Sequence, residues 1–312
     1  MEFNSVITTQ INQNTPIIRI KDRLFDDQNI SFYIKREDLN HPYISGNKWH
    51  KLKYNIQEAK KLGKDTLLTF GGAYSNHIYA VAAAGKIFKL NTIGIIRGEE
   101  HLPLNPTLSF ASENGMEIHY LDRISYRNKN SARVLNTLYK KFGDFYLLPE
   151  GGTNDLAVKG CSEIINKINI DFDYICCPCG TGGTLAGLVS GLERKSFALG
   201  FAVLKGASFL KENVNNLLKN QGNTSLKNWD VNLDYHFGGY AKFTRELSNF
   251  IEKFKSSTEI PIEPIYTGKM LYGIYDLAKN GYFRNGSTII SVHTGGLQGL
   301  KGLETKIKFM NR

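Results

Sequence analysis

A glycine-rich loop in the second half of the chain has the residue types needed to bind an anion. It reads Cys179-Gly180-Thr181-Gly182-Gly183-Thr184 and follows a short apolar run that predicts a buried strand. Glycines let several backbone N–H groups point at one anion, threonine hydroxyls add donors, and the following helix offers its positive N-terminus. No Gly-Lys-Ser/Thr follows, and Leu185 occupies the third glycine position of a dinucleotide loop. The loop therefore predicts a phosphate site, with a ligand-free turn as the alternative, made by Gly180, Thr181, Gly182, Gly183 and Thr184.

Lys48 is the candidate nucleophile. It follows Ser45-Gly46-Asn47 and opens a helical pattern that stops at Gly63. A helix N-terminus disfavours an ammonium ion and so favours a neutral, nucleophilic amine, although a solvated surface lysine is the ordinary alternative. A lysine amine and a phosphate loop are the two protein parts that pyridoxal 5'-phosphate (PLP) needs, because the lysine bonds to the cofactor aldehyde and the loop holds its phosphate. The two segments together predict PLP as the cofactor.

Three other polar segments follow predicted strands. Gly71-Gly72-Ala73-Tyr74-Ser75-Asn76-His77 joins a strand to a helix, and Ser75 or Asn76 could simply cap that helix. The functional alternative places Asn76 against the cofactor ring and Ser75 beside the reacting carbon, with backbone amides near a substrate carboxylate. His77 alone is more typical of a packed histidine than of a catalyst. The other two segments, 264–269 and 292–296, could each be a turn, and they carry Tyr266, Thr267 and Thr294.

Strand and helix patterns alternate along most of the chain. Buried strands are predicted over 31–35, 66–70, 92–96, 145–148, 174–177, 197–204 and 288–292. Helices are predicted over 48–62, 78–88 and 184–192. This alternation is typical of an α/β fold with mainly parallel, twisted sheets flanked by helices, in which ligand groups gather at the carboxyl ends of strands. No Pro/Ser-rich linker divides the chain, so any second domain is expected to be an insertion.

Composition narrows the classes of function. The chain has 312 residues, of which 41% are hydrophobic, and a net charge of +10 spread over helical patterns. We expect no nucleic-acid partner, because the basic residues do not cluster with aromatic ones. We expect no membrane association, because no apolar run approaches ~18 residues, and a cytoplasmic location, because the N-terminus lacks a signal pattern. No metal site is predicted, since four cysteines lack zinc-site spacing and are expected to be buried thiols, namely Cys161, Cys176, Cys177 and Cys179.

The ordered motifs resemble one family of PLP enzymes. Lys35-Arg36-Glu37-Asp38 followed by Gly46-Asn47-Lys48 is similar to the opening signature of the branch that contains 1-aminocyclopropane-1-carboxylate (ACC) deaminase and D-cysteine desulfhydrase. This branch has the tryptophan synthase β-like fold, also called fold type II. The later motifs follow in the family's order, namely Ser75-Asn76-His77, the loop 180–184, Tyr266-Thr267-Gly268-Lys269 and His293-Thr294-Gly295-Gly296.

The resemblance covers about Ile18 to Leu300 and implies an architecture. It implies a larger PLP-binding domain from residues 1–49 and 153–312, a smaller inserted α/β domain from residues 50–152, and a homodimer. One departure from the family pattern is Glu150-Gly151-Gly152-Thr153, where a Val-Gly-Gly-Ser-like stretch is more familiar.

The resemblance also implies roles for the candidate residues. Lys48 would be the Schiff-base lysine, Asn76 would bond the phenolic oxygen of the ring, and Thr294 would lie at the pyridine nitrogen. The loop 180–184 would hold the phosphate. The implied catalytic residues are Lys48, Ser75, Tyr240 and Tyr266. The implied substrate contacts are Ser75, Asn76, His77, Tyr240, Tyr266 and Thr267.

Thr267 and Thr294 favour one activity within the branch. In the deaminase of this branch, the sequences at these two motifs resemble Tyr-Glu-Gly-Lys and His-Leu-Gly-Gly. A carboxylate at the pyridine nitrogen makes a strong electron sink, whereas a hydroxyl gives a weaker one that suffices when a thiolate leaves Cβ. The expected function is therefore D-cysteine desulfhydrase, an α,β-elimination on a small amino acid that yields pyruvate, ammonia and sulfide. The open alternatives are ACC deaminase, an amino-acid racemase or dehydratase, and a non-enzymatic PLP-binding protein.

Overall fold

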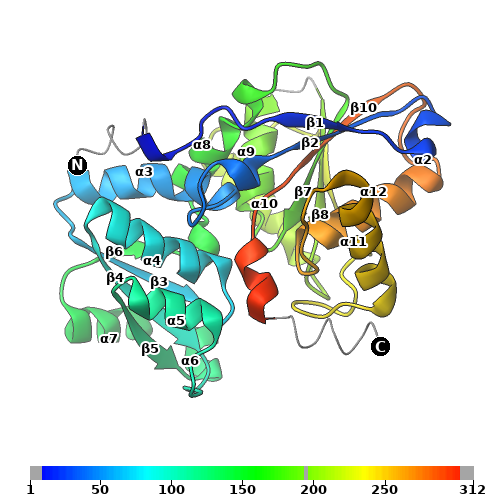
Figure 1. Cartoon of the computed structure of the whole chain (residues 1–312). Coiled ribbons are helices and arrows are strands. Elements are labelled where there is room, and N and C mark those ends of the chain that lie inside the picture. The colour runs from blue at the N-terminus through cyan, green and yellow to red at the C-terminus, as the bar shows by residue number, and fades with distance from the viewer. Residues whose placement is uncertain (1–8, 193–195, 303–312) are drawn as a thin grey trace.

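The larger of two sheets has six strands and lies in the right-hand half of the molecule as seen in Figure 1. The computed structural model describes residues 9–192 and 196–302. Strand β1 is antiparallel to its neighbour, and the other pairings are parallel. In spatial order the strands are β1 (Ile17–Ile20), β2 (Ser31–Lys35), β10 (Thr288–Val292), β7 (Tyr174–Cys179), β8 (Phe197–Ala202) and β9 (Trp229–Asn232).

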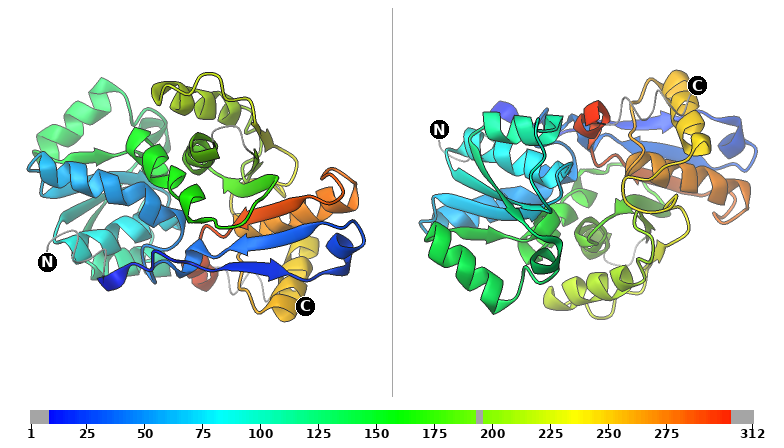
Figure 2. Two further views of the ribbon diagram at one scale, coloured as in Figure 1. Left: turned by 90° about the horizontal axis from the view of Figure 1, so that it is seen from above. Right: turned by 90° about the horizontal axis from the view of Figure 1, so that it is seen from below.

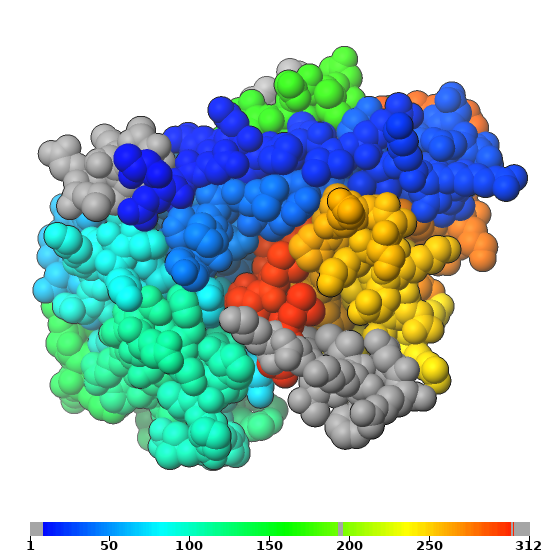
Figure 3. Space-filling model, viewed as in Figure 1, coloured from blue at the N-terminus to red at the C-terminus, as the bar shows by residue number. Residues whose placement is uncertain are grey.

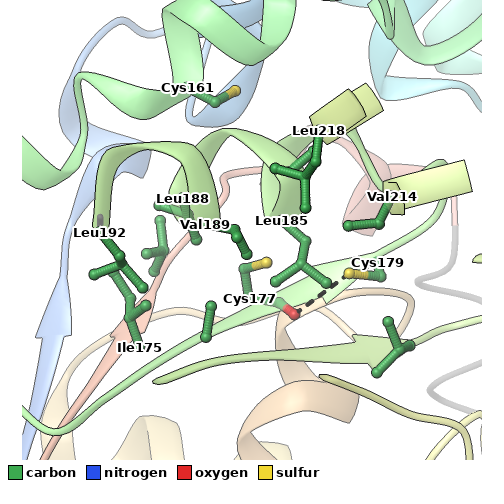
Figure 4. Packing of buried hydrophobic residues seen from close by; sticks show 14 of the residues in the cluster. Cys161, Ile175, Cys177, Cys179, Leu185, Leu188, Val189, Leu192, Val214 and Leu218 are labelled. Atoms are coloured by element: carbon green, nitrogen blue, oxygen red, sulfur yellow. Dashed lines mark hydrogen bonds between the residues drawn. The ribbon is translucent and has the colours of Figure 1, made fainter. Parts of the chain in front are cut away.

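Helices cover both faces of this sheet. Figure 4 shows one face, where the thiols of Cys177 and Cys179 lie among Leu185, Val189 and Val214. All four cysteines are free and buried, as expected. The helices on this face are α8 (Asp155–Ser162), α9 (Gly183–Leu192) and α10 (Phe209–Asn220). Those on the opposite face are α2 (Arg23–Asp26), α11 (Arg245–Thr258) and α12 (Thr267–Lys279).

The smaller sheet is entirely parallel. In spatial order its strands are β5 (Met116–Leu121), β4 (Asn91–Arg97), β3 (Thr66–Gly71) and β6 (Tyr146–Leu148). One face packs against α3 (Asn47–Lys61), α4 (Asn76–Phe88) and α5 (Pro106–Glu113). The other packs against α6 (Arg123–Arg127) and α7 (Ala132–Phe142). The α/β class with mainly parallel sheets flanked by helices is confirmed.

The two sheets form separate lobes that lie side by side (Figure 2). The four strands of the smaller sheet all fall between residues 66 and 148, inside the stretch 50–152 expected as an insertion. The division into domains at residues 49 and 153 stays a prediction. A short 3₁₀ helix, η4 (Leu297–Gly302), follows β10 and sits between the lobes in Figure 3. No helix of the described residues is long and apolar enough to cross a membrane.

Candidate active site

A cavity of about 490 Å³ lies between the two lobes. Its walls come from the carboxyl ends of β3, β4, β6, β7 and β10, where parallel sheets gather ligand-binding groups. Every residue predicted for the site lines this cavity except Gly183 and Thr267. The fold therefore brings together segments as far apart in the sequence as Lys48 and Thr294.

Lys48 occupies the first turn of α3, so the predicted helix start is confirmed. The preceding Gly46 has φ of +66°, and a Cβ there would lie 2.0 Å from the carbonyl oxygen of Thr294. Only glycine allows this approach, which sets the start of α3 against the turn after β10. Burial, followed by the nearby charge of Lys51, lowers the pKa of Lys48 to about 7. A large share of Lys48 is thus a neutral amine near pH 7, the form that attacks an aldehyde.

A buried polar network holds the chain on the other side of Gly46. Glu37 accepts hydrogen bonds from the Thr15 hydroxyl at 2.6 Å and pairs with His50 Nε2 at 2.6 Å. Asn40 Nδ2 donates to the carbonyl of Gly46 at 2.9 Å. Burial acts to raise the pKa of Glu37, but the bonds from His50 and Thr15 and the charge of Lys35 lower it to about 2. The ionised Glu37 therefore fixes α3 through His50, two residues after Lys48.

The glycine loop has the geometry of an anion cradle. Gly182 has φ of +85°, and a Cβ there would lie 2.8 Å from a methyl carbon of Val214. Gly183 begins α9, and a Cβ there would lie 2.8 Å from the Thr153 side chain and 3.3 Å from Lys51 Nζ. Asn47 Nδ2 donates to the Thr184 hydroxyl at 2.8 Å, which joins the starts of α3 and α9. The loop leaves room, backbone donors and a helix N-terminus for a phosphate.

Lys51 is the site residue that sequence reasoning missed. It lies one turn after Lys48 on α3, is 3% exposed, and lines the cavity. Its Nζ donates to the Gly151 carbonyl at 3.1 Å and to the Thr153 hydroxyl at 3.0 Å, and it lies 3.5 Å from the Thr181 hydroxyl. A buried lysine beside the glycine loop supplies the positive charge that a phosphate requires. The three-residue spacing from Lys48 was the available signal, since it places both lysines on one helix face.

The segment before α4 caps that helix and also faces the cavity. Ser75 Oγ accepts hydrogen bonds from the backbone N–H groups of His77 at 3.2 Å and Ile78 at 3.3 Å, so N-capping is confirmed. Asn76 Oδ1 accepts from Gln298 Nε2 at 2.5 Å, which leaves its amide nitrogen for a ligand. Ser75 and Asn76 both line the cavity, so capping and ligand contact are compatible.

His77 is a neutral, packed histidine. The Thr69 hydroxyl donates to the Leu148 carbonyl at 2.9 Å, so it accepts from His77 Nε2 at 2.8 Å. Burial, with smaller effects of Lys48 and Lys51, holds the pKa of His77 well below its usual value. Its Nδ1 is buried without a hydrogen-bond partner in the described part of the chain. His77 thus braces the end of β3 in its neutral form.

Two tyrosines form the opposite wall. The rings of Tyr240 and Tyr266 meet edge to face with centroids 6.1 Å apart. The loop that carries Tyr240 is held by Lys269, a buried lysine on α12 that donates to the carbonyls of His236 at 2.9 Å and Gly239 at 2.8 Å. Lys269 therefore places Tyr240 against Tyr266.

Thr267 lies behind this wall. It is fully buried, and its hydroxyl donates to the Glu263 carboxylate at 3.1 Å. The Glu263 oxygens also accept from the backbone N–H groups of Ile265, Tyr266 and Thr267 at 2.7 to 2.9 Å. Geometry thus gives Thr267 a structural place at the start of α12, and the substrate contact predicted for it has no support from the cavity lining. Thr294, by contrast, lines the cavity directly after β10.

Comparison with known proteins decides the family. The model of the pyridoxal-phosphate dependent enzyme family matches residues 8–295. The chain belongs to this family. It is 33% identical to a putative ACC deaminase of Pyrococcus furiosus, over 86% of this chain and 85% of that protein. It is also 33% identical to a mitochondrial bifunctional D-cysteine desulfhydrase/ACC deaminase of Arabidopsis thaliana, over 86% of this chain and 73% of that protein.

A solved structure described as an ACC deaminase homologue superposes with a TM-score of 0.83 at 28% identity, covering 99% of each chain. The expected resemblance, the type II fold and the PLP cofactor are thereby confirmed, and the protein is a PLP-dependent enzyme. The cavity fits that cofactor, because the cradle at Gly182 and Gly183, backed by the Lys51 cation, faces the same space as the Lys48 amine.

Proposed function

We propose that the enzyme is a lyase that eliminates the β-substituent of a small amino acid, with D-cysteine as the first candidate. The products would be pyruvate, ammonia and sulfide. The observation that carries this proposal is that the cavity is lined at the carboxyl end of β10 by Thr294, a residue with a hydroxyl and no carboxylate. A hydroxyl at the pyridine nitrogen makes a weak electron sink, which suits the departure of a good leaving group from Cβ.

Different residues of the cavity would hold different parts of the cofactor. Lys48 would bond to the aldehyde, and Asn76 would contact the ring. Loop 180–184 and Lys51 would bind the phosphate, through backbone N–H groups, two threonine hydroxyls and one ammonium. When bound, PLP stabilises the negative charge that forms at Cα after its proton leaves.

The chain's own side chains supply binding and proton transfer. Lys48 would accept the Cα proton, because its lowered pKa of about 7 keeps the amine neutral at working pH. Ser75 Oγ accepts two backbone N–H groups, so its hydroxyl proton remains to donate to the substrate carboxylate. Tyr240 and Tyr266 would cover the substrate from the opposite lobe and keep water from the site.

ACC deamination is the second candidate, since relatives are named for it. Opening an unactivated ring requires a stronger electron sink, which a carboxylate at the pyridine nitrogen would supply. Glu263 lies in the right region, since its Cγ is 3.7 Å from a Cβ placed on Gly296. Its oxygens are occupied by three backbone amides, however, and it does not line the cavity. This arrangement favours elimination over ring opening.

The test is product release from PLP-loaded protein given D-cysteine, L-cysteine or ACC in parallel. Sulfide and pyruvate from D-cysteine would support the proposal, and 2-oxobutanoate from ACC alone would overturn it. Lys48→Ala is expected to abolish both turnover and the absorbance of the lysine-bound cofactor, and retention of either would show that Lys48 is misassigned. A change of chirality, or keto acid without sulfide from a hydroxy amino acid, would instead reveal a racemase or dehydratase.

The remaining expectations stay predictions. They are a homodimer, a cytoplasmic location, a small amino acid as substrate, and no nucleic-acid partner. Size-exclusion chromatography with light scattering would test the first of these directly.

A further inference from the structure

Four residues of the smaller lobe form a charged rim at the cavity: Arg97, Tyr126, Lys129 and Glu150. Arg97 is the last residue of β4, Tyr126 and Lys129 belong to α6 and the turn after it, and Glu150 follows β6. The charged side chains of Arg97, Lys129 and Glu150 all line the same cavity as Lys48. No role in the elimination described above uses any of them.

Lys129 and Glu150 balance each other within this rim. Lys129 Nζ lies 3.0 Å from Glu150 Oε2, and the Tyr126 hydroxyl donates to Glu150 Oε1 at 2.9 Å. Both carboxylate oxygens of Glu150 are therefore engaged. Since Glu150 is the one carboxylate among the described residues that line the cavity, the wall offers no second anion.

Arg97 is an exposed cation at the end of β4, without an anionic partner among the described residues. Among residues 9–192 and 196–302 its guanidinium has no ion pair and no side-chain hydrogen bond. Its Cζ lies 6.0 Å from the centroid of the Tyr126 ring, whose hydroxyl is held by Glu150. Its Nη2 lies 3.9 Å from a Cβ placed on Gly72, at the start of the loop that leads to Ser75. The rim thus orients a bidentate donor beside the loop assigned to the substrate.

Lys51 and Arg97 have different neighbours within the cavity. Lys51 serves the glycine loop, where its Nζ is surrounded by Gly151, Thr153 and Thr181. Arg97 lies instead beside Gly72 and within electrostatic range of Tyr240 across the cleft. Burial raises the pKa of Tyr240, and among the smaller effects Arg97 lowers it and Glu150 raises it. A phosphate held by Lys51 therefore leaves the guanidinium of Arg97 available to a second anion.

We propose that the charged rim is a subsite for an anionic group carried on the β-substituent of the substrate, with Arg97 as the residue that binds it. This inference rests on the proposed lyase function and names a substrate class for it, amino acids whose Cβ bears a phosphate, sulfate or thiosulfate ester. In the elimination the Cα proton is lost and the Cβ–O or Cβ–S bond breaks, its electron pair leaving with the anionic group. Water then hydrolyses the enamine product to pyruvate and ammonia.

The test compares O-phosphoserine with O-acetylserine, each as the D and the L form, in PLP-loaded wild type, Arg97→Gln and Arg133→Gln. Both esters release pyruvate, so one assay serves for all. Arg133 is an exposed residue of α7 that does not line the cavity, and its variant controls for the loss of one positive charge. S-sulfocysteine is tested as a second anionic substrate. Its leaving group departs through sulfur, whereas that of O-phosphoserine departs through oxygen. Binding is followed independently through the change in cofactor absorbance on titration.

Wild type and Arg133→Gln are expected to prefer the anionic ester in kcat/KM. Arg97→Gln is expected to reduce this preference by about tenfold to a hundredfold, mostly through KM and the titrated Kd, as for loss of a charged hydrogen bond. Equal losses of kcat/KM with both esters would show that Arg97 serves the α-carboxylate, and no loss with either ester would show that it binds neither group, so each result overturns the inference alone. No pyruvate from any amino acid with PLP bound would overturn the proposed function and the inference together.

Discussion

Lys51→Met tests whether Lys51 binds the phosphate of the cofactor. Lys51 Nζ lies 3.0 to 3.5 Å from three oxygens around the glycine loop, so it is already held where a phosphate would meet it. Methionine keeps most of the side-chain volume and removes the charge. A hydrogen bond to a charged group contributes about 1.5–3 kcal/mol, and each 1.4 kcal/mol is about tenfold in affinity. The dissociation constant for PLP is therefore expected to rise about tenfold to a hundredfold.

The same variant should change Lys48. After burial, the charge of Lys51 is the next cause that lowers the pKa of Lys48 to about 7. Without that charge the pKa of Lys48 rises, so the amine is neutral only at higher pH. The rate at which apoenzyme captures PLP, measured against pH, should shift its midpoint upward in Lys51→Met.

The matched control is Lys53→Met on the same helix. Lys53 pairs with Glu163 and does not line the cavity, so its variant loses a charge from α3 without touching the phosphate loop. PLP titration of both apoenzymes by fluorescence should show the loss of affinity in Lys51→Met alone. A dissociation constant for Lys51→Met within twofold of wild type would refute the assignment of Lys51 to the phosphate.

Two further outcomes are expected. Glu37→Gln should lower the free energy of unfolding by about 3–5 kcal/mol in urea at pH 7, because it removes the negative charge that faces buried Lys35 and His50. Since the pKa of Glu37 in the folded protein, about 2, lies below the unfolded value of about 4.3, this contribution is full above pH 4.3 and is lost toward pH 2. Lys269→Met should lower the melting temperature, because the carbonyls that hold the Tyr240 loop lose their donor. It should also raise KM for the amino acid more than the Kd for PLP. Equal changes in both constants would argue against a role of Lys269 in placing Tyr240.

Interior strands could be predicted from the sequence to within two residues, whereas three of the four edge strands could not. The bounds of β2 and β10 match their apolar runs, because both lie inside the larger sheet and are covered on both faces. Three strands missed by the apolar pattern, β1, β5 and β9, all lie at sheet edges. There most residues are only partly buried, so polar side chains interrupt the hydrophobic pattern.

The residues of the active site also differ in how well the sequence predicts them. Residues in the loops that follow buried strands, such as Ser75, Gly180 and Thr294, could be found because strand ends in a parallel sheet converge. Thr267 shows the limit of that reasoning, since its neighbour Tyr266 lines the cavity while its own hydroxyl turns back to Glu263. The direction of a side chain at a helix start depends on the cap that the backbone needs, and here Glu263 supplies it.

Lys51 and the charged rim depend on contacts that no local pattern encodes. Lys51 meets Gly151 and Thr153 only because α3 packs against α8, which brings together residues about one hundred positions apart. A lysine in a helical pattern is ordinarily solvated, and only burial against those partners turns it into a ligand group. Glu150 likewise was visible as a charged departure from the family pattern, but its pairing with Lys129 is what leaves Arg97 without an anion. The subsite proposed for the β-substituent therefore depends on side-chain pairing within the smaller lobe, which no sequence motif encodes.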